Sequence, residues 1–137
     1  MRSSTWIVGV LVVVAACSKD DTAGVTPMTA TKEATSPRDV VFDAWKAGGL
    51  TLSPFETANT QVGQDCTRGK VGSLDVLVCT YGSSDAAKAA EAAAYRWVGD
   101  TTGAAQARGS LVIAIADRVK SDPNGKTINQ LMKLAPK

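Results

Sequence analysis

Two cysteines in the middle of the chain have the spacing of a disulfide across a β-hairpin. Cys66 and Cys79 lie on either side of Gly72-Ser73, a dipeptide that suits a two-residue turn between the alternating runs that flank it. A turn there places Cys66 directly opposite Cys79, at a non-hydrogen-bonded pair with Cα atoms ~4.5 Å apart. We therefore predict a structural Cys66–Cys79 disulfide. A redox-active pair is the alternative, although the C-x-x-C spacing that lowers a thiol pKa is absent.

The same register sorts the other residues of the hairpin between its two faces. It places Lys70 opposite Asp75 as an exposed charge pair, and a slip of one residue would destroy this match. One face is then nearly all apolar and is expected to meet the helices; it includes Val71, Leu74, Val76 and Val78.

The side chains that usually carry catalysis are few. The chain has no histidine, which excludes Ser-His and Cys-His nucleophiles in their usual forms. The acids best suited to general acid–base work are Glu56, Asp65 and Glu91, but their spacing brings no two of them together. We therefore expect a protein that is not an enzyme, with no catalytic residues.

Two short patterns near the C-terminus resemble ligand loops. Asp117, Asp122 and Asn124 offer oxygen ligands for a hard cation, but their spacing does not match an EF-hand. The tripeptide Gly-Lys-Thr at 125–127 resembles the end of a phosphate-binding loop, but Lys120 occupies the position of the first glycine that the motif needs. A capped turn explains both patterns, and we expect no metal and no cofactor.

Four aromatic residues are candidates for stacking on a sugar. Trp45 and Trp97 fall on the inward faces of predicted helices, so core packing is the favoured interpretation for both. Tyr81 and Tyr95 are the others, and Tyr81 is the best exposed candidate because it shares a hairpin face with Arg68.

The N-terminus carries the third cysteine behind an apolar run. Residues 6–16 have no charge, and Val14-Ala15-Ala16 precedes Cys17. This pattern resembles the lipobox of bacterial lipoproteins. The resemblance implies cleavage before Cys17, lipid on Cys17, and a bacterial cell envelope location; Ser18 favours the outer membrane, facing the periplasm. An ordinary secretory signal cut after Ala16 and an uncleaved anchor are the alternatives.

Composition then divides the chain into three parts. We predict a signal peptide at 1–16, a lipidated cysteine with a disordered tether at 17–37, and a single domain at 38–137. Removing Arg2 with the signal leaves 14 of the 15 basic side chains against 13 acidic ones. This balance gives no reason to expect nucleic acid as a partner.

The domain is expected to be α+β, in the order α-β-β-α-β-α. A helix capped by Ser36 stops at Gly48-Gly49, a second runs from Ser83 or Ser84 to Val98, and a third follows the turn at 122–125. The apolar run 111–116 predicts an interior strand beside 74–80, reached by a crossover through the second helix. We expect a sheet of three to four strands containing the hairpin, with the helices packed on one face.

These inferences favour a membrane-anchored envelope lipoprotein that is a non-enzymatic binding or structural module. The bilayer is its partner through acylated Cys17, together with an envelope protein or the cell wall. The alternatives are a small periplasmic enzyme or thiol redox factor that uses Cys66 and Cys79, and a binder of cell-wall glycan.

Overall fold

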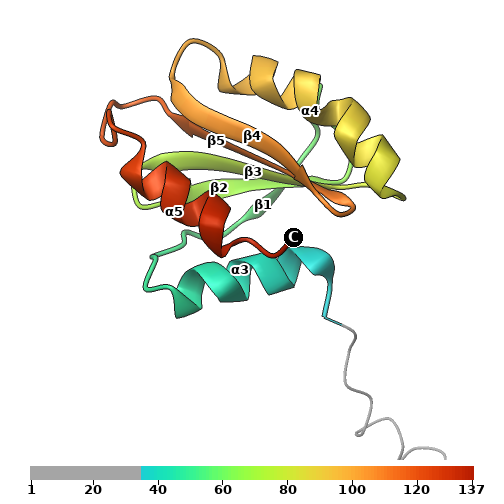
Figure 1. The fold of residues 1–137 in the computed structure, drawn as a ribbon, viewed down its shortest axis with the longest axis horizontal. Helices are drawn as coiled ribbons and strands as arrows, with labels where there is room; N and C mark the ends of the chain where they lie inside the picture. The colour runs from blue at the N-terminus through green and yellow to red at the C-terminus, as the bar shows by residue number, and fades with distance from the viewer. Residues whose placement is uncertain (1–34) are drawn as a thin grey trace, which may run out of the picture. The chain divides into compact units, whose positions relative to one another are not determined.

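The computed structural model describes residues 35–137 (Figure 1). The predicted signal peptide at 1–16, Cys17 and nearly all of the predicted tether at 17–37 lie outside the described residues. Within residues 35–137, no helix has both the length and the apolar character needed to cross a membrane.

The fold is α+β, as predicted, but its sheet has five strands rather than three to four. Every neighbouring pair of strands is antiparallel, and the strand order is β1-β2-β3-β5-β4. The elements, in chain order, are α3 (Pro37–Ala47), β1 (Glu56–Ala58), β2 (Cys66–Val71), β3 (Leu74–Thr80), α4 (Ser84–Val98), β4 (Thr102–Arg108), β5 (Leu111–Asp117) and α5 (Lys126–Leu134).

Helices cover both faces of the sheet, so the prediction that they pack on one face is wrong. Figure 1 shows α3 and α5 on one side of the sheet and α4 on the other. Strand β3 explains this arrangement, because Val76 and Val78 lie in the cluster with α3 and α5, whereas Leu77 and Cys79 lie in the cluster with α4. Alternate side chains of a strand point to opposite faces, and both sets here are apolar. A strand of this kind needs a cover on each face.

The hairpin has the predicted register. Cys66 is opposite Cys79 and Lys70 is opposite Asp75, with Gly72 in the left-handed conformation of the turn at φ 60°. Strand β3 then pairs with β5, which confirms the predicted neighbour of the run 111–116.

The helix boundaries follow the predicted caps. The Ser36 side chain accepts a hydrogen bond from the Asp39 backbone N–H, and the Asp39 carboxylate accepts one from the Ser36 backbone N–H in return. The Ser83 side chain accepts from the Ala86 backbone N–H at the start of α4, which ends at Gly99. Each side-chain cap satisfies a helix donor that would otherwise lack a partner inside the helix.

Two strands were not predicted. Strand β1 occupies residues 56–58, and β4 occupies residues 102–108. Helix α4 therefore leads into β4, and the chain returns through Gly109-Ser110 as β5. The predicted direct crossover from the second helix to 111–116 is wrong, because β4 intervenes between them.

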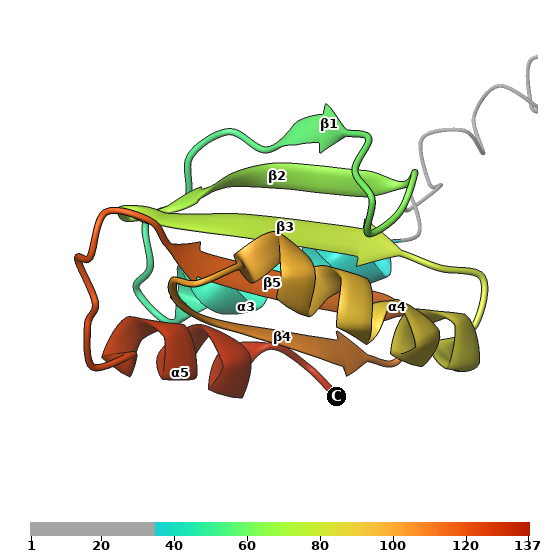
Figure 2. The same cartoon turned by 90° about the horizontal axis from the view of Figure 1, so that it is seen from above.

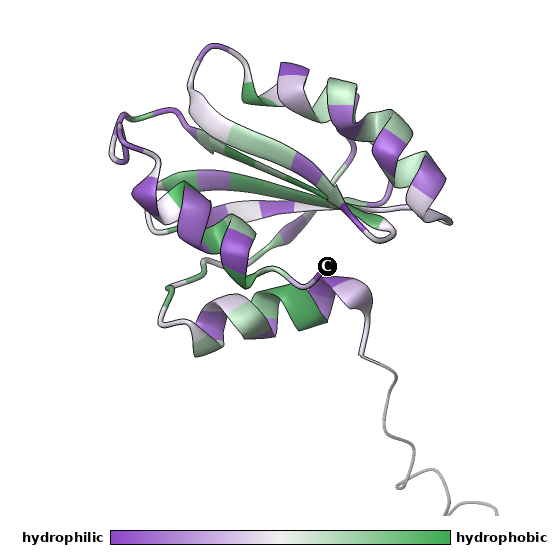
Figure 3. Ribbon diagram, viewed as in Figure 1, coloured by the Kyte–Doolittle hydropathy of each residue, from purple (hydrophilic) through white to green (hydrophobic). Residues whose placement is uncertain are grey.

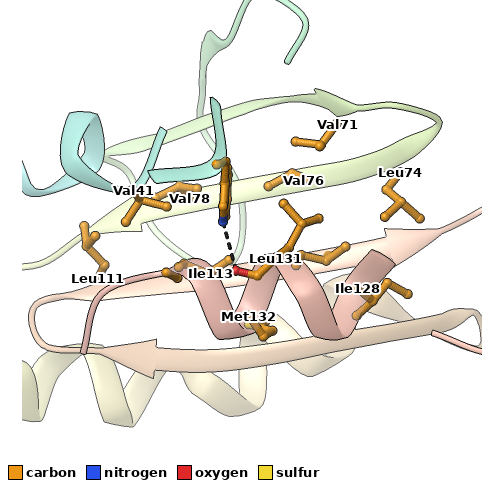
Figure 4. Packing of buried hydrophobic residues seen from close by; sticks show 13 residues of the cluster. Val41, Val71, Leu74, Val76, Val78, Leu111, Ile113, Ile128, Leu131 and Met132 are labelled. Carbon is orange, nitrogen blue, oxygen red and sulfur yellow. Dashed lines mark hydrogen bonds between the residues drawn. The ribbon is translucent and has the colours of Figure 1, made fainter. Parts of the chain in front are cut away.

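The larger core lies between the sheet and the pair α3 and α5 (Figure 4). Trp45 of α3 is fully buried there, and its indole N–H donates to the Leu131 carbonyl oxygen of α5 at 2.9 Å. This bond ties together two helices that are far apart in the sequence. Figure 3 shows apolar residues gathered along the central strands, with hydrophilic residues interspersed along the helices.

Candidate functional site

Helix α4 covers only half of its face of the sheet. It packs on β4 and β5, and Figure 2 shows β1 and β2 lying clear of it. On this open half, the outward-facing side chains of β2 include Arg68 and Lys70, which are both exposed. Polar groups on a sheet face that no helix covers are free to meet a ligand.

A hollow of about 400 Å³, here called the basin, lies on this open half next to the end of α4. Strands β1, β2 and β3 contribute to it, and α4 and the residue that follows β5 complete the wall. The residues that line it are Pro54, Glu56, Arg68, Gly69, Lys70, Asp75, Val76, Trp97 and Arg118.

One carboxylate organises the charges of the basin. Asp75 forms ion pairs with Lys70 Nζ at 3.3 Å and with Arg118 Nε at 3.4 Å. Arg118 also donates to the Trp97 carbonyl oxygen at 2.8 Å, and its guanidinium carbon lies 4.9 Å from the centre of the Trp97 ring. A guanidinium at this distance attracts the ring electrostatically. The ion pairs and the stacking hold the Trp97 side of the basin in one arrangement.

Arg68 stands apart from that network. It is opposite Glu56 in the β1–β2 register, yet within residues 35–137 its side chain makes no ion pair and no hydrogen bond. Three cations and two carboxylates line the basin, so its formal charge is positive. Arg68 is the cation best placed to form a two-pronged bond with an acidic group of a ligand.

The disulfide lies at the other end of the β2–β3 hairpin. Cys66 and Cys79 are linked, with Cα atoms 4.0 Å apart, and both residues are fully buried. The Tyr81 hydroxyl donates to the Val62 carbonyl oxygen in the loop that leads to β2, and burial raises the pKa of Tyr81. A thiol that attacked this disulfide would first have to displace the loop, so the position of the disulfide favours a structural role over a redox role.

The two ligand-like patterns near the C-terminus form one hydrogen-bonded turn. Asp117 is buried and accepts from Ser121 N at 2.9 Å and Asp122 N at 2.6 Å. Burial raises the pKa of Asp117, but these bonds outweigh it and hold the pKa below its usual range. Asp122 in turn accepts from the backbone N–H groups of Lys126 and Ile128.

The hydrogen bonds that Asp117 and Asp122 accept account for the arrangement of this turn without a bound ligand. The amides at the start of α5 that a phosphate would use already donate to Asp122. Within residues 35–137, no group of three or more histidine, cysteine or acidic side chains is arranged to hold a metal ion.

The three candidate acids lie in three different places. Glu56 borders the basin, Asp65 pairs with Arg38 at 2.8 Å, and Glu91 accepts from the Ala107 backbone N–H at 2.6 Å. The structure therefore brings no two of them together as an acid and base pair.

The aromatic candidates also separate. Trp45 is buried in the core as predicted. Trp97 packs against the cluster under α4, also as predicted, but it is only half-buried and lines the basin as well. Tyr81 is half-buried at the disulfide end, and Tyr95 is exposed on α4 outside the basin. The aromatic residue that borders a ligand-sized hollow is thus Trp97, not Tyr81.

The basin as a whole could not be predicted from the sequence. Arg68 and Lys70 alternate along β2, which indicated a polar sheet face, but nothing in the pattern joined them to Trp97 and Arg118.

No known protein family, curated protein or solved structure matches this chain.

Proposed function

We propose that this chain is a lipid-anchored binding module of the bacterial cell envelope, which holds an acidic ligand or partner in the basin and does no chemistry on it. The observation that supports this proposal is the basin itself. It combines a fixed aromatic wall, Trp97 under Arg118, with an exposed arginine, Arg68, that has no protein partner within residues 35–137. A small number of convergent polar groups beside an apolar surface is typical of ligand-binding sites.

The anchor in this proposal is Cys17. The lipobox-like residues before it favour acylation, and the bilayer is then the first partner of the chain. Nineteen residues, 18–36, separate Cys17 from the start of α3 at Pro37, and a flexible segment of that length would have a reach of ~25 Å. We expect the domain to sit just off the outer membrane, on its periplasmic side.

The anchor has a direct test. Changing Cys17→Ser should release the protein from the membrane fraction and abolish its labelling with palmitate. A variant that still labels and still pellets with membranes would refute acylation at Cys17.

A cell-wall glycan is the second candidate ligand, and the exposure of Trp97 favours it. Aromatic rings stack on the apolar faces of sugars, and Trp97 offers part of its ring to the basin. The thiol redox alternative is less well supported, because Cys66 and Cys79 are fully buried beneath a closed loop.

Crosslinking in living cells tests whether the basin is the binding surface. A photoreactive amino acid at Glu56, which is exposed at the border of the basin and leaves Arg68 in place, should give a discrete adduct, and one at Lys88, exposed on α4 away from the basin, should give none. Adding Trp97→Ala should weaken the adduct at position 56, whereas Tyr95→Ala, also on α4 but outside the basin, should not. Equal adducts at both positions, or none at 56, would refute the basin as the binding surface.

Sedimentation with purified peptidoglycan separates the two candidate ligands. If glycan is the ligand, the protein should pellet with peptidoglycan, Trp97→Ala should reduce the pelleted fraction, and Tyr95→Ala should not. Pelleting that neither change affects would exclude glycan binding in the basin and leave an acidic protein partner as the ligand.

A further inference from the structure

The basin presents two separate positions that carry positive charge. Arg68 is the first position: it is exposed, and its side chain makes no ion pair within residues 35–137. The second position, here called the shared site, consists of Lys70 and Arg118, which both pair with the Asp75 carboxylate, one with each oxygen. One carboxylate neutralises only one of these two cations, so the shared site keeps one positive charge. Two such positions suit a ligand with two acidic groups.

The two positions are held apart and do not converge on one point. Asp75 lies directly opposite Lys70 on β3, so their ion pair draws the Lys70 ammonium towards that strand. Arg68 lies between Leu77 on β3 and Glu56 on β1, and it makes no ion pair with Glu56. A single phosphoryl group would need both cations to converge on it, whereas two separate acids can meet the two positions where they lie.

Strand geometry sets the spacing of the two acids. Arg68 and Lys70 are two residues apart on β2 and point to the same face, so their positions along the strand differ by about 6.6 Å. Alternate side chains of any other extended chain share a face and repeat at the same distance. An extended peptide along β2 therefore brings acids at residues i and i+2 to both positions together. Acids one or three residues apart would point to opposite faces, and only one of them would reach the basin.

We propose that the ligand of the basin is an extended acidic segment of a partner protein, in which two carboxylate side chains lie two residues apart. Arg68 binds one carboxylate and the shared site binds the other. This inference rests on the proposed function, in which the basin is the ligand site. The face of β1 and β2 is open beyond the two acids, because α4 packs on β4 and β5 (Figure 2). Exposed ion pairs contribute little each, so the further contacts of a peptide on this face favour it over a free dicarboxylate.

Glu56 should weaken the binding of such a segment. It is exposed on β1 directly opposite Arg68, and it carries the same charge as the incoming acids. Because like charges at opposed positions of a sheet repel, we expect Glu56→Gln to strengthen the binding about two- to fivefold. Glutamine keeps the volume of the side chain, and a gain of affinity cannot come from damage to the fold.

Fluorescence anisotropy with three labelled peptides tests the spacing. The peptides have equal length and charge, and each carries two glutamates, one, two or three residues apart, among threonines that favour an extended backbone. The protein is the chain from Cys17 onward carrying Cys17→Ser, which removes the expected lipid. The peptide with glutamates two residues apart should bind about three- to tenfold more tightly than the other two. Equal binding of all three peptides, or binding of none, would overturn the proposal.

Matched variants locate the binding on the protein. Arg68→Gln and Lys70→Gln should each weaken the binding of the preferred peptide about three- to tenfold. Arg96→Gln and Lys88→Gln remove the same charges from exposed positions of α4 outside the basin, and they should leave the binding unchanged. Equal losses from both pairs would show that net charge alone attracts the peptide, and would overturn the proposal. If a basin variant fails to fold in thermal unfolding, Glu56→Gln decides, since the absence of any gain in affinity contradicts the proposal.

Two further measurements separate the ways in which the proposal can fail. Inorganic phosphate should displace the preferred peptide no better than chloride at equal ionic strength; specific displacement by phosphate would overturn the proposal in favour of a phosphoryl ligand. A discrete adduct at position 56 in cells, combined with no preference among the peptides, would keep the basin as the ligand site and refute only the acidic segment. The absence of that adduct would refute the basin itself.

Discussion

Removing the disulfide is the perturbation whose effect follows most directly from the structure. Cys66 and Cys79 are 13 residues apart in the sequence and face each other in the hairpin. Closing a loop of this size removes unfolded-state entropy worth ~3 kcal/mol in the chain-entropy model. The double change Cys66→Ala and Cys79→Ala also deletes two fully buried sulfur atoms, and the void adds about 1 kcal/mol. The expected loss is therefore about 3–4 kcal/mol.

Urea unfolding, followed by circular dichroism in a Cys17→Ser background, measures this loss. The double variant should unfold cooperatively with its β signal retained, because the Gly72-Ser73 turn and the apolar face still set the register. Chemical reduction of the unmutated pair is the matched control: it removes the crosslink but keeps the sulfur atoms, so it should cost about 3 kcal/mol alone. A loss below ~1 kcal/mol in both experiments would refute the reasoning, as would free thiols at both positions in the native protein.

Three further changes test other parts of the fold. Trp45→Phe should cost about 1–3 kcal/mol in urea unfolding, because it removes a buried hydrogen bond between α3 and α5 and leaves a void in the core, while the Leu131 carbonyl keeps its bond from the Ala135 N–H. The lowered pKa of Asp117 contributes stability that is present above pH ~4 and lost as pH falls through the folded-state pKa, so Asp117→Asn should flatten the acid limb of a stability–pH curve. Gly103→Ala should destabilise the domain by about 1–3 kcal/mol, because a Cβ there would collide with the β5 backbone and with an α4 side chain. Gly82→Ala is the control: a Cβ at Gly82 has no neighbour within 4 Å, so the change should leave the thermal unfolding temperature unaltered.

The hairpin was predictable because several independent signals agree on it. Gly72 marks the turn, the apolar residues fall on one face, and Cys66 meets Cys79 only in that register. The helices were predictable from their ends, since Ser36 and Ser83 are strong caps and the apolar residues that follow have helical spacing. In these segments local chemistry and global packing require the same structure.

Strand β4 was not predictable because its sequence lacks strand character. The stretch Thr-Gly-Ala-Ala-Gln-Ala-Arg has one β-branched residue, and alanine and glutamine favour helix. It forms a strand because it lies between α4 and β5, where small residues fit beneath the helix: Ala105 is 3% exposed, and any side chain on Gly103 would collide with its surroundings. Tertiary packing overrides weak local preference here, and no pattern of one segment can reveal it.

The basin depends on this same strand, which is why the site was hidden from the sequence. The helices were expected together on the apolar hairpin face, which includes Val71, Val76 and Val78. That prediction placed α4 on the opposite side of the sheet from Arg68 and Lys70. Because β4 and β5 extend the sheet beyond β3, α4 packs over them instead and leaves the face of β1 and β2 open. The shift also places Trp97, at the end of α4, beside Arg118, at the end of β5, across from the charges of β2. An unpredicted edge strand thus creates the candidate ligand site.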